Sequence, residues 1–269
     1  MSTNTIVLVT GANRGIGLGI FQALLTSTKP YTLLLTSRDL ARGQEAAKSI
    51  ESDIKASNGS TVVPMQLDIE DDESIAKLYD EVEKQFGRID ALVNNAGAAF
   101  DMAAPRLKWS HRKLWSYTYN LNVISTDALT HKFMPLLLQS SNPHLLFLTS
   151  TVASLTESFI EQLPYNTPPT DKGWPKDLGF DIPAYRSSKV ALNMMGRHWA
   201  KNTKADGVIV HLVDPGLVAT EFGGGDPAAK ALRGAPPPIV PGQLVRRVVE
   251  GELDGDAGKV VGLKGVVDW

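Results

Sequence analysis

The sequence predicts an α/β fold, a doubly wound, seven-stranded parallel β-sheet with helices on both faces. Short runs of leucine and β-branched residues alternate along the chain with amphipathic helical stretches. This alternation is typical of right-handed strand–helix–strand crossovers. Most of the runs are continuously apolar, as strands covered by helices on both faces should be. The seven predicted strands are residues 6–10, 31–36, 61–67, 91–94, 144–149, 207–213 and 259–262.

Helical patterns fill the intervals between these strands. Residues 39–57 and 71–86 are amphipathic, and a glycine follows each pattern within two residues, which is a common C-terminal signal. Residues 110–138 are long enough for a central helix. Pro183 and Pro241 each suit the first turn of a further helix. Strands and helices therefore alternate over the whole chain, without an internal repeat.

Two connections are longer than ordinary loops. Residues 155–182 are polar and contain four prolines, and about residues 217–238 form a second long connection that ends in a stretch rich in glycine, alanine and proline. Connections of this length are usually functional or disordered. Because periodic structure resumes after each, we interpret residues 1–269 as a single domain with an insertion and a functional loop at these positions.

Composition and charge narrow the classes of function. The chain has 269 residues and a net charge of −2, so it shows no basic excess that would suit nucleic acid. Cysteine is absent, and the five histidines show no metal-ligand spacing, so neither a disulfide nor a metal is expected. No apolar run approaches the length of a membrane span, and the first strand begins too early for a secretory segment. We expect a cytoplasmic enzyme or binding protein with no nucleic-acid or membrane partner.

A glycine-rich loop follows the first predicted strand. Its sequence, TGANRGIG, carries Gly11, Gly15 and Gly17. Glycines at such positions let the backbone turn sharply and approach a pyrophosphate, whose charge the N-terminus of the following helix stabilises. The alternative is a tight turn that needs only positive φ angles. The strand before the loop and the helix after it favour a dinucleotide site, and with it a Rossmann fold.

The end of the second predicted strand indicates which dinucleotide binds. NAD sites usually place an Asp or Glu there to hold the ribose 2′-hydroxyl. Here the strand ends at Arg38, and Asp39 suits the N-cap of the next helix. Arg38 and Arg14 can hold a 2′-phosphate through charge-assisted hydrogen bonds, although two surface arginines are the alternative reading. The pattern favours NADP over NAD.

A tyrosine and a lysine form the candidate reacting centre. Tyr185 and Lys189 are four residues apart on a predicted helix and therefore share a face. An ammonium beside a phenol favours the phenolate and lowers the pKa of tyrosine from about 10. Tyr185 is thus a candidate proton donor to a carbonyl that receives hydride. Such pairs are common by chance on helix surfaces, so this one alone indicates little.

The motifs together resemble the short-chain dehydrogenase/reductase superfamily. They match it in order and spacing: TGxxxGIG at 10–17, NNAG at 94–97, YxxxK at 185–189 and DPGLVAT at 214–220. The region around Arg38, the Gly-Trp-Pro sequence at 173–175 and the C-terminal Trp269 are most similar to the NADPH-dependent carbonyl reductase branch. The resemblance covers essentially the whole chain. It is specific for fold and cofactor and only loosely informative about substrate.

The resemblance implies roles for individual residues. Arg14 and Arg38 would hold the adenosine phosphate, Asp68 and Ile69 would flank the adenine, and Asn122 would support a water chain to the lysine. The implied NADP(H)-binding residues are Gly11, Asn13, Arg14, Gly15, Ile16, Gly17, Arg38, Asp68, Ile69, Asn95, Ala96, Gly97, Tyr185, Lys189, Pro215, Gly216, Val218 and Thr220. The implied catalytic residues are Asn122, Thr151, Tyr185 and Lys189.

The hydroxyl that would hold the substrate carbonyl has two candidates. The superfamily pattern, placed on residues 150–154, puts the catalytic position on Thr151, where the family has serine. Threonine keeps the hydrogen-bond donor but adds a methyl group and a stiffer χ1. A shift of one residue would assign the role to Ser150, whose side chain lies on the opposite face of the strand. The pattern favours Thr151.

These observations favour an NADPH-dependent carbonyl reductase. Hydride would pass to a ketone or aldehyde carbon, Tyr185 would donate the proton and Thr151 would hold the oxygen. The candidate pocket walls, largely aromatic, suit a bulky or aromatic carbonyl compound: Phe100, Ser154, Phe159, Tyr165, Trp174, Phe180, Leu217 and Phe222. The alternative is an NADP-binding scaffold with a non-redox role as a cyclase, isomerase or cofactor-sensing regulator, because a fold does not determine a function.

The distance between two motifs bears on oligomeric state. Many superfamily members form tetramers through the helix that carries the tyrosine, and the resembled branch covers that surface with an insertion. Here 34 positions separate Thr151 from Tyr185, so an insertion of this kind is expected. The sequence therefore predicts a monomer, with a homo-oligomer as the alternative.

Overall fold

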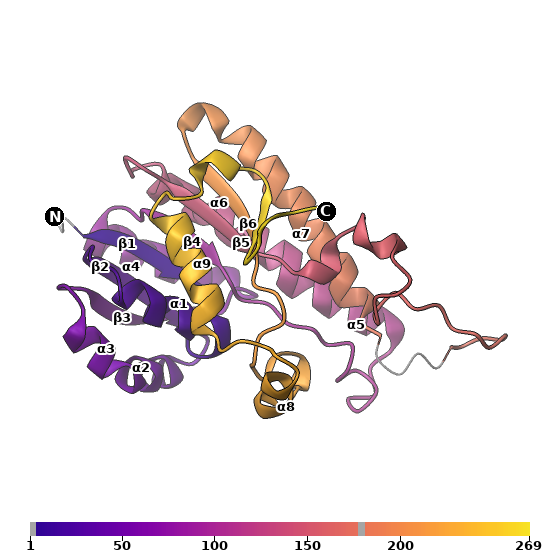
Figure 1. Ribbon diagram of the computed structural model, residues 1–269. Coiled ribbons are helices and arrows are strands. Elements are labelled where there is room, and N and C mark those ends of the chain that lie inside the picture. The colour runs from indigo at the N-terminus through magenta and orange to yellow at the C-terminus, as the bar shows by residue number, and fades with distance from the viewer. Residues whose placement is uncertain (1–3, 177–180) are drawn as a thin grey trace.

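The computed structural model describes residues 4–176 and 181–269. Within these residues the strands form an eight-stranded sheet of order β3-β2-β1-β4-β5-β6-β7-β8 (Figure 1). The first seven strands pair in parallel, whereas β8 pairs with β7 in the antiparallel direction. The strands are β1 (Thr5–Val9), β2 (Tyr31–Ser37), β3 (Thr61–Gln66), β4 (Ala91–Asn94), β5 (His144–Leu148), β6 (Ile209–Asp214), β7 (Val260–Gly262) and β8 (Gly265–Val267).

The seven predicted parallel strands are confirmed, and the prediction of a seven-stranded sheet is one strand short. The additional strand, β8, has only three residues and is largely exposed. It pairs with β7 after a tight turn. Because it has only three residues, it is too short to show an apolar alternation in the sequence. The doubly wound topology is confirmed, because the chain leaves the sheet on one side of β1 and resumes on the other at β4.

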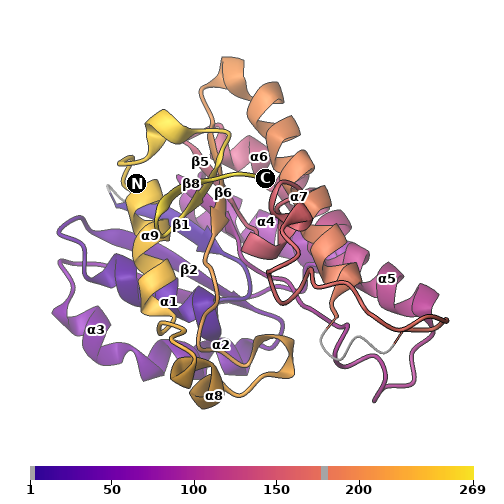
Figure 2. The same cartoon turned by 45° about the vertical axis from the view of Figure 1, so that its right-hand side comes forward.

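Helices cover both faces of the sheet. In β1, Val7 and Val9 belong to one apolar core and Ile6 and Leu8 to the other, because successive side chains of a strand point to opposite faces. Figures 1 and 2 show α1 and α9 on one face and α4, α6 and α7 on the other. The α-helices are α1 (Gly15–Leu25), α2 (Leu40–Ser49), α3 (Glu51–Ala56), α4 (Asp72–Phe86), α5 (His111–Tyr119), α6 (Ser125–Leu137), α7 (Pro183–Asn202), α8 (Pro227–Leu232) and α9 (Ile239–Val249). No helix in the described part of the chain is long and apolar enough to cross a membrane.

Two predicted helices are interrupted. The pattern at residues 39–57 divides into α2 and α3 at Ile50, whose backbone leaves the helical region. The pattern at residues 110–138 contains a π-helical turn, η1 (Asn120–Ile124), between α5 and α6. Short 3₁₀ turns complete the structure: η2 (Thr151–Ala153), η3 (Glu157–Phe159), η4 (Lys204–Asp206), η5 (Phe222–Gly224) and η6 (Asp254–Asp256). Pro183 and Pro241 lie in the first turns of α7 and α9, as predicted.

Helix α1, which follows the glycine-rich loop, is held at very short range against the start of α9. A Cβ atom at Gly19 would lie 2.3 Å from the carbonyl oxygen of Pro238, and one at Gly242 would lie 2.3 Å from the carbonyl oxygen of Gly19. Neither side could relax easily, because both obstacles are backbone atoms. The two glycines therefore set how closely the helices approach, and with it the position of the N-terminus of α1.

We predict that Gly19→Ala destabilises the protein by about 1–3 kcal/mol, the usual range for an overpacked contact. The matched control is Gly43→Ala in α2, where a Cβ would meet its nearest neighbour at an ordinary 3.5 Å. That change should stabilise the fold by roughly 0.5–1 kcal/mol, because alanine loses less backbone entropy than glycine. Chemical denaturation of the two variants measures both effects; equal stabilities would contradict the close contact.

Candidate active site

The glycine-rich loop has the geometry that only glycine accommodates. Gly11 and Gly15 have φ angles of 62° and 56°, in the left-handed region that other residues rarely adopt. A Cβ atom at Gly17 would lie 2.7 Å from the Cα atom of Ala12. The loop leads directly into the N-terminus of α1, where backbone N–H groups and the helix dipole favour an anion. The loop therefore fits a pyrophosphate.

The loop after β4 is fastened to this glycine-rich loop. The Asn95 side chain donates hydrogen bonds to the carbonyl oxygens of Thr10 and Gly11, at 2.7 and 3.1 Å. The Thr10 hydroxyl accepts from the backbone N–H groups of Asn95 and Ala96, both at 2.9 Å. The predicted NNAG and TGxxxGIG motifs thus form one hydrogen-bonded unit at the carboxyl ends of β1 and β4.

The two arginines predicted to read the adenosine phosphate lie in different environments. Arg38 is exposed immediately after β2, and Asp39 caps α2 as predicted, accepting from the Ala41 N–H group. The guanidinium of Arg14 forms an ion pair of 2.8 Å with Glu221, and both side chains are largely exposed. Arg14 thus bridges the glycine-rich loop and the loop after β6, a contact that the sequence did not indicate.

Tyr185 and Lys189 lie on one face of α7, and both side chains are buried. The Lys189 Nζ atom lies 5.8 Å from the centre of the Tyr185 ring and donates a 2.8 Å hydrogen bond to the carbonyl oxygen of Leu148 at the end of β5. The Ser150 hydroxyl lies close enough to the Tyr185 phenol to lower its pKa as a hydrogen-bond partner. The hydroxyl of Thr151 donates instead to Asp214, at 2.6 Å. Of the two candidate hydroxyls, the structure brings Ser150 to the tyrosine.

The pKa of Tyr185 is shifted in the opposite direction to the one expected. Burial raises the pKa of Tyr185 well above its usual value; the hydrogen bond from Ser150 acts against this, and the charge of Asp214 adds to it. The same burial lowers the pKa of Lys189 to about 8. Desolvation penalises the charged form of both groups, and it is the largest cause of both pKa shifts.

Asn122 connects α7 to the loop that follows β4. Its side-chain amide donates to the Ala98 carbonyl oxygen and the Ser188 hydroxyl, both at 2.9 Å, and accepts from the Ala98 N–H group at 2.9 Å. It belongs to the π-helical turn η1, a feature that is frequent at functional sites. A Cβ atom at Gly97 would lie 3.0 Å from Asn122 Oδ1 and 3.5 Å from Lys189 Nζ, so this glycine keeps the backbone close to both.

Asp101 is a site residue that the sequence analysis missed. Its carboxylate accepts from the backbone N–H groups of Ala184 and Tyr185, at 2.9 and 3.2 Å. It thereby caps α7, whose own N-cap residue Ile182 has no oxygen in its side chain. Burial raises the pKa of Asp101. An indication was present in the sequence, since a helix with isoleucine at the N-cap leaves N–H groups that need an acceptor from elsewhere.

The loop after β6 contacts both the glycine-rich loop and Tyr185. A Cβ atom at Gly15 would lie 3.6 Å from the methyl group of Thr220, so this loop lies against the glycine-rich loop. The Phe222 ring packs on Tyr185 at 5.4 Å between ring centres. Lys230 Nζ donates to the carbonyl oxygens of Thr220 and Phe222, both at 2.7 Å. Lys230 therefore holds this part of the loop together, and Phe222 places it against the tyrosine.

The insertion after η2 is anchored by the residue next to the tyrosine. Arg186 donates to the carbonyl oxygens of Val152 and Tyr165, at 3.1 and 2.7 Å, and to the side chain of Asn166 at 2.7 Å. Both views show this segment lying against the first half of α7 (Figures 1 and 2). The insertion is therefore tied to the helix that carries Tyr185.

The candidate wall residues are only partly gathered around the tyrosine. Phe222 contacts the Tyr185 ring, whereas Phe100 packs against Trp109. Phe159 and Trp174 are exposed over more than four fifths of their surface. The remaining positions are Ser154, which is buried, Tyr165, which stacks under Arg186, Leu217, which is exposed, and Phe180, which lies outside the described residues.

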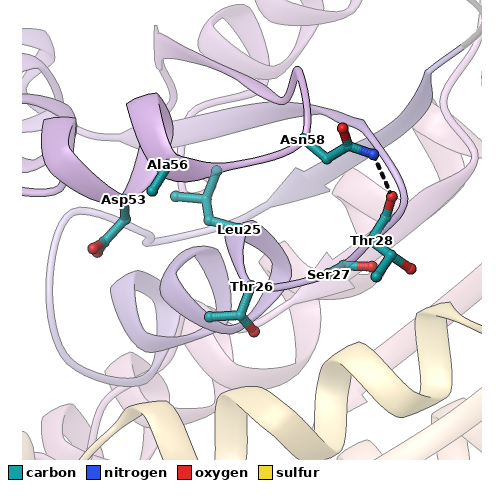
Figure 3. Close-up of a pocket in the computed structure, with 7 residues that line it drawn as sticks. All are labelled: Leu25, Thr26, Ser27, Thr28, Asp53, Ala56 and Asn58. Carbon is teal, nitrogen blue, oxygen red and sulfur yellow. Dashed lines mark hydrogen bonds between the residues drawn. The ribbon is translucent and has the colours of Figure 1, made fainter.

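A pocket elsewhere in the molecule contains none of these groups. Leu25, Thr26, Ser27 and Thr28, at the C-terminal end of α1, line it together with Asp53, Ala56 and Asn58 (Figure 3). This is the end of α1 opposite to the glycine-rich loop. Because ligands of open parallel sheets bind at the carboxyl ends of the strands, we place the site at the carboxyl edge of the sheet.

The fold and the site define an oxidoreductase of the short-chain dehydrogenase/reductase superfamily, and the chain belongs to it. The family model for short chain dehydrogenases matches residues 5–167. The short-chain dehydrogenase/reductase tropE of Talaromyces stipitatus is 37% identical over 265 residues, covering 97% of this chain and 96% of that protein.

Other relatives indicate the carbonyl reductase branch. Carbonyl reductase [NADPH] 1 of Homo sapiens is 28% identical over 292 residues, which cover 98% of both chains. The crystal structure of an NADPH-bound carbonyl reductase from chicken fatty liver superposes with a TM-score of 0.76 at 27% identity and covers 99% of both chains. The branch inferred from the motifs is confirmed by these similarities.

We predict that burial of Lys189 makes stability depend on pH between 8 and 10. Because the pKa of this lysine is lowered to about 8, the unfolded chain binds its proton more tightly, and stability rises with pH in this window. The difference in unfolding free energy between the wild type and Lys189→Met should therefore grow by about 2 kcal/mol from pH 7.5 to 9.5, at about 1.4 kcal/mol per pH unit.

Urea denaturation at each pH measures this difference, and Lys201→Met, an exposed lysine on the same helix, is the matched control. The control should show a pH-independent difference from the wild type. A pH-independent difference for Lys189→Met as well would mean that the lysine is not desolvated.

Proposed function

We propose that the protein is an NADPH-dependent carbonyl reductase acting on a ketone or aldehyde. The observation that carries this proposal is the convergence of Ser150, Tyr185 and Lys189 at the carboxyl edge of the sheet, beside the glycine-rich loop. When bound, NADPH supplies the hydride that reduces the carbonyl carbon. The chain's own residues bind the cofactor, orient the carbonyl and deliver a proton to its oxygen.

The residues present fit this cofactor. The positive φ angles of Gly11 and Gly15 turn the loop into the N-terminus of α1, whose backbone N–H groups suit a pyrophosphate. Lys189 and Thr220 lie near the loops that would hold the nicotinamide half. Arg14 and Arg38 suit a 2′-phosphate, because an arginine fork makes charge-assisted hydrogen bonds with phosphate oxygens. The similarity to carbonyl reductases named for NADPH supports the same choice.

In the proposed chemistry Tyr185 donates the proton, and the phenol remains protonated at neutral pH because burial raises its pKa. Ser150, which hydrogen-bonds the phenol, would hold the same carbonyl oxygen. This revises the assignment of Thr151 made from the motif, since the Thr151 hydroxyl is engaged by Asp214. Lys189 places a positive charge beside the tyrosine, and Asn122 fixes the loop at Ala98 against α7.

The surroundings of Tyr185 support a bulky or aromatic carbonyl substrate. The Phe222 ring lies on Tyr185, and Leu217 on the same loop is exposed over 58% of its surface. An apolar, flat compound would bury these side chains in place of water. The assignment of residues 155–182 and 217–238 as insertion and substrate loop, the monomeric state and the cytoplasmic location stay predictions.

The alternative, an NADP-binding scaffold with a non-redox role, loses its motivation. It rests on the fact that a fold does not determine a function, and the Thr151 in place of the family serine gave it additional support. Since Ser150 has a hydroxyl next to Tyr185 and Lys189 is present, the set of groups that a reductase needs is complete. Tight NADPH binding without oxidation across a broad panel of ketones, aldehydes and quinones would restore the scaffold hypothesis.

We predict that Ser150→Ala lowers kcat by about 100- to 1,000-fold, as the loss of an oxyanion donor does, whereas Thr151→Ala lowers it by less than about tenfold. Tyr185→Phe should lower it at least as much as Ser150→Ala, because it removes the proton donor. NADPH oxidation with the best carbonyl of the panel measures all three, with NADPH affinity as a control of folding. The reverse order for Ser150 and Thr151 would return the role to Thr151.

We predict that Glu221→Gln tightens NADPH binding by about two- to fivefold, with little effect on NADH. The change releases Arg14 from its ion pair with Glu221, so the guanidinium can bind the 2′-phosphate without first leaving a carboxylate. The effect on affinity is small because exposed ion pairs are weak. The matched control is Glu252→Gln, which breaks a less exposed ion pair of similar length with Arg247. Fluorescence titration at low salt measures the affinities, and equal changes for both coenzymes would contradict this role of Arg14.

A further inference from the structure

We propose that Asp214 is a positioning residue of the reaction, whose buried carboxylate orients Ser150 by holding Thr151. The inference rests on the proposed function and goes beyond it, because Asp214 belongs to neither the cofactor-binding nor the catalytic set. It is the last residue of β6, the strand next to β5 in the sheet.

The carboxylate accepts three hydrogen bonds from two loops. Its Oδ1 atom accepts from the backbone N–H groups of Thr151 and Gly216, both at 2.9 Å. Its Oδ2 atom accepts from the Thr151 hydroxyl at 2.6 Å. Asp214 is only 5% exposed, and such bonds to a buried carboxylate are short and strong. Thr151 therefore serves as the partner of Asp214, which accounts for a hydroxyl at this position.

These bonds hold Ser150 in place from its C-terminal side. On its N-terminal side, the Thr149 N–H group donates to the Val213 carbonyl oxygen at 2.8 Å, and the Thr149 hydroxyl donates to Asn193 at 2.5 Å. Ser150 itself has an extended backbone, with φ −163° and ψ 145°. Because neighbouring residues of an extended chain point in opposite directions, holding Thr151 on Asp214 directs Ser150 towards Tyr185.

The same carboxylate shapes the beginning of the substrate loop. Gly216 has a φ angle of 68°, and its N–H group is held by Asp214, which closes a turn at Pro215. This turn starts the segment that brings Thr220 to the glycine-rich loop. One side chain thus joins the ends of β5 and β6 and aligns the serine with the loop over the site.

The charge of Asp214 also acts on the proton donor. It raises the pKa of Tyr185, in addition to the larger effect of burial. The charged groups that face Tyr185 from the surrounding elements are Lys189 on α7, Asp101 at the start of that helix and Asp214 on β6. A donor works in its protonated form, so a variant that loses this negative charge should lose activity at a lower pH on the alkaline side.

The test is Asp214→Asn, which keeps the size of the side chain and one oxygen that can accept from the two backbone N–H groups. We expect kcat to fall about tenfold or more and the alkaline limb of kcat to move down by about 0.5–1 pH unit. The NADPH dissociation constant should change by less than about threefold. Asp256→Asn, a change to a half-buried aspartate bound to Lys259, is the matched control and should leave both quantities unchanged.

A second measurement does not depend on turnover. Hydrogen exchange at the Thr151 and Gly216 amides should accelerate in Thr151→Val and more so in Asp214→Ala, whereas Thr151→Ser, which keeps the hydroxyl, should preserve wild-type protection. Unchanged protection in Asp214→Ala, or an Asp214→Asn enzyme with wild-type kcat and pH profile, would overturn the proposal. If no carbonyl is reduced but the exchange result holds, the positioning of Ser150 stands and the proposed activity fails.

Discussion

The parallel pairing of β1, β4, β5 and β6 is the constraint on which the site depends. It brings the carboxyl ends of four strands to one edge of the sheet. Each end carries a different functional segment: the glycine-rich loop, the NNAG sequence, the serine and threonine after β5, and Asp214. Their side chains meet only because parallel strands end together. The chemistry of the molecule is thus a consequence of strand direction before it is a consequence of any single residue.

The site combines several charged or ionisable groups that are buried away from water. Tyr185, Lys189, Asp101 and Asp214 are all less than a tenth exposed. Burying such groups is unfavourable unless hydrogen bonds compensate, and here the two carboxylates accept from backbone N–H groups while the lysine donates to a backbone carbonyl. The residual cost is visible in the pKa shifts of the tyrosine and the lysine. Buried ionisable groups with pKa values shifted in this way cluster at functional sites.

The sequence predicts the strands and the glycine-rich loop of this site well, but it predicts poorly which side chains hydrogen-bond to one another within it. Continuous apolar runs identify the seven parallel strands, and glycine spacing identifies the loop after β1, because both are local patterns. The assignment of the hydroxyl to Thr151 rests on one residue of register. The competing fact, that Asp214 lies 63 positions further along the chain and captures Thr151, is a tertiary contact. The sequence analysis misses Asp101 for the same reason, because Asp101 caps a helix that begins 82 residues later.

Arg186 ties the insertion to the helix that carries Tyr185. Arg186 follows Tyr185 directly on α7, and its guanidinium binds two segments of the chain that flank the site, at Val152 and at Tyr165. A planar fork with five donors can satisfy several carbonyl oxygens at once, which a lysine cannot do. Any shift of the insertion is therefore transmitted to the first turn of α7 and to the segment after Ser150. The insertion and the helix that carries Tyr185 are held by one side chain, so in the proposed function the selection of the substrate and the orientation of the proton donor would be parts of a single arrangement.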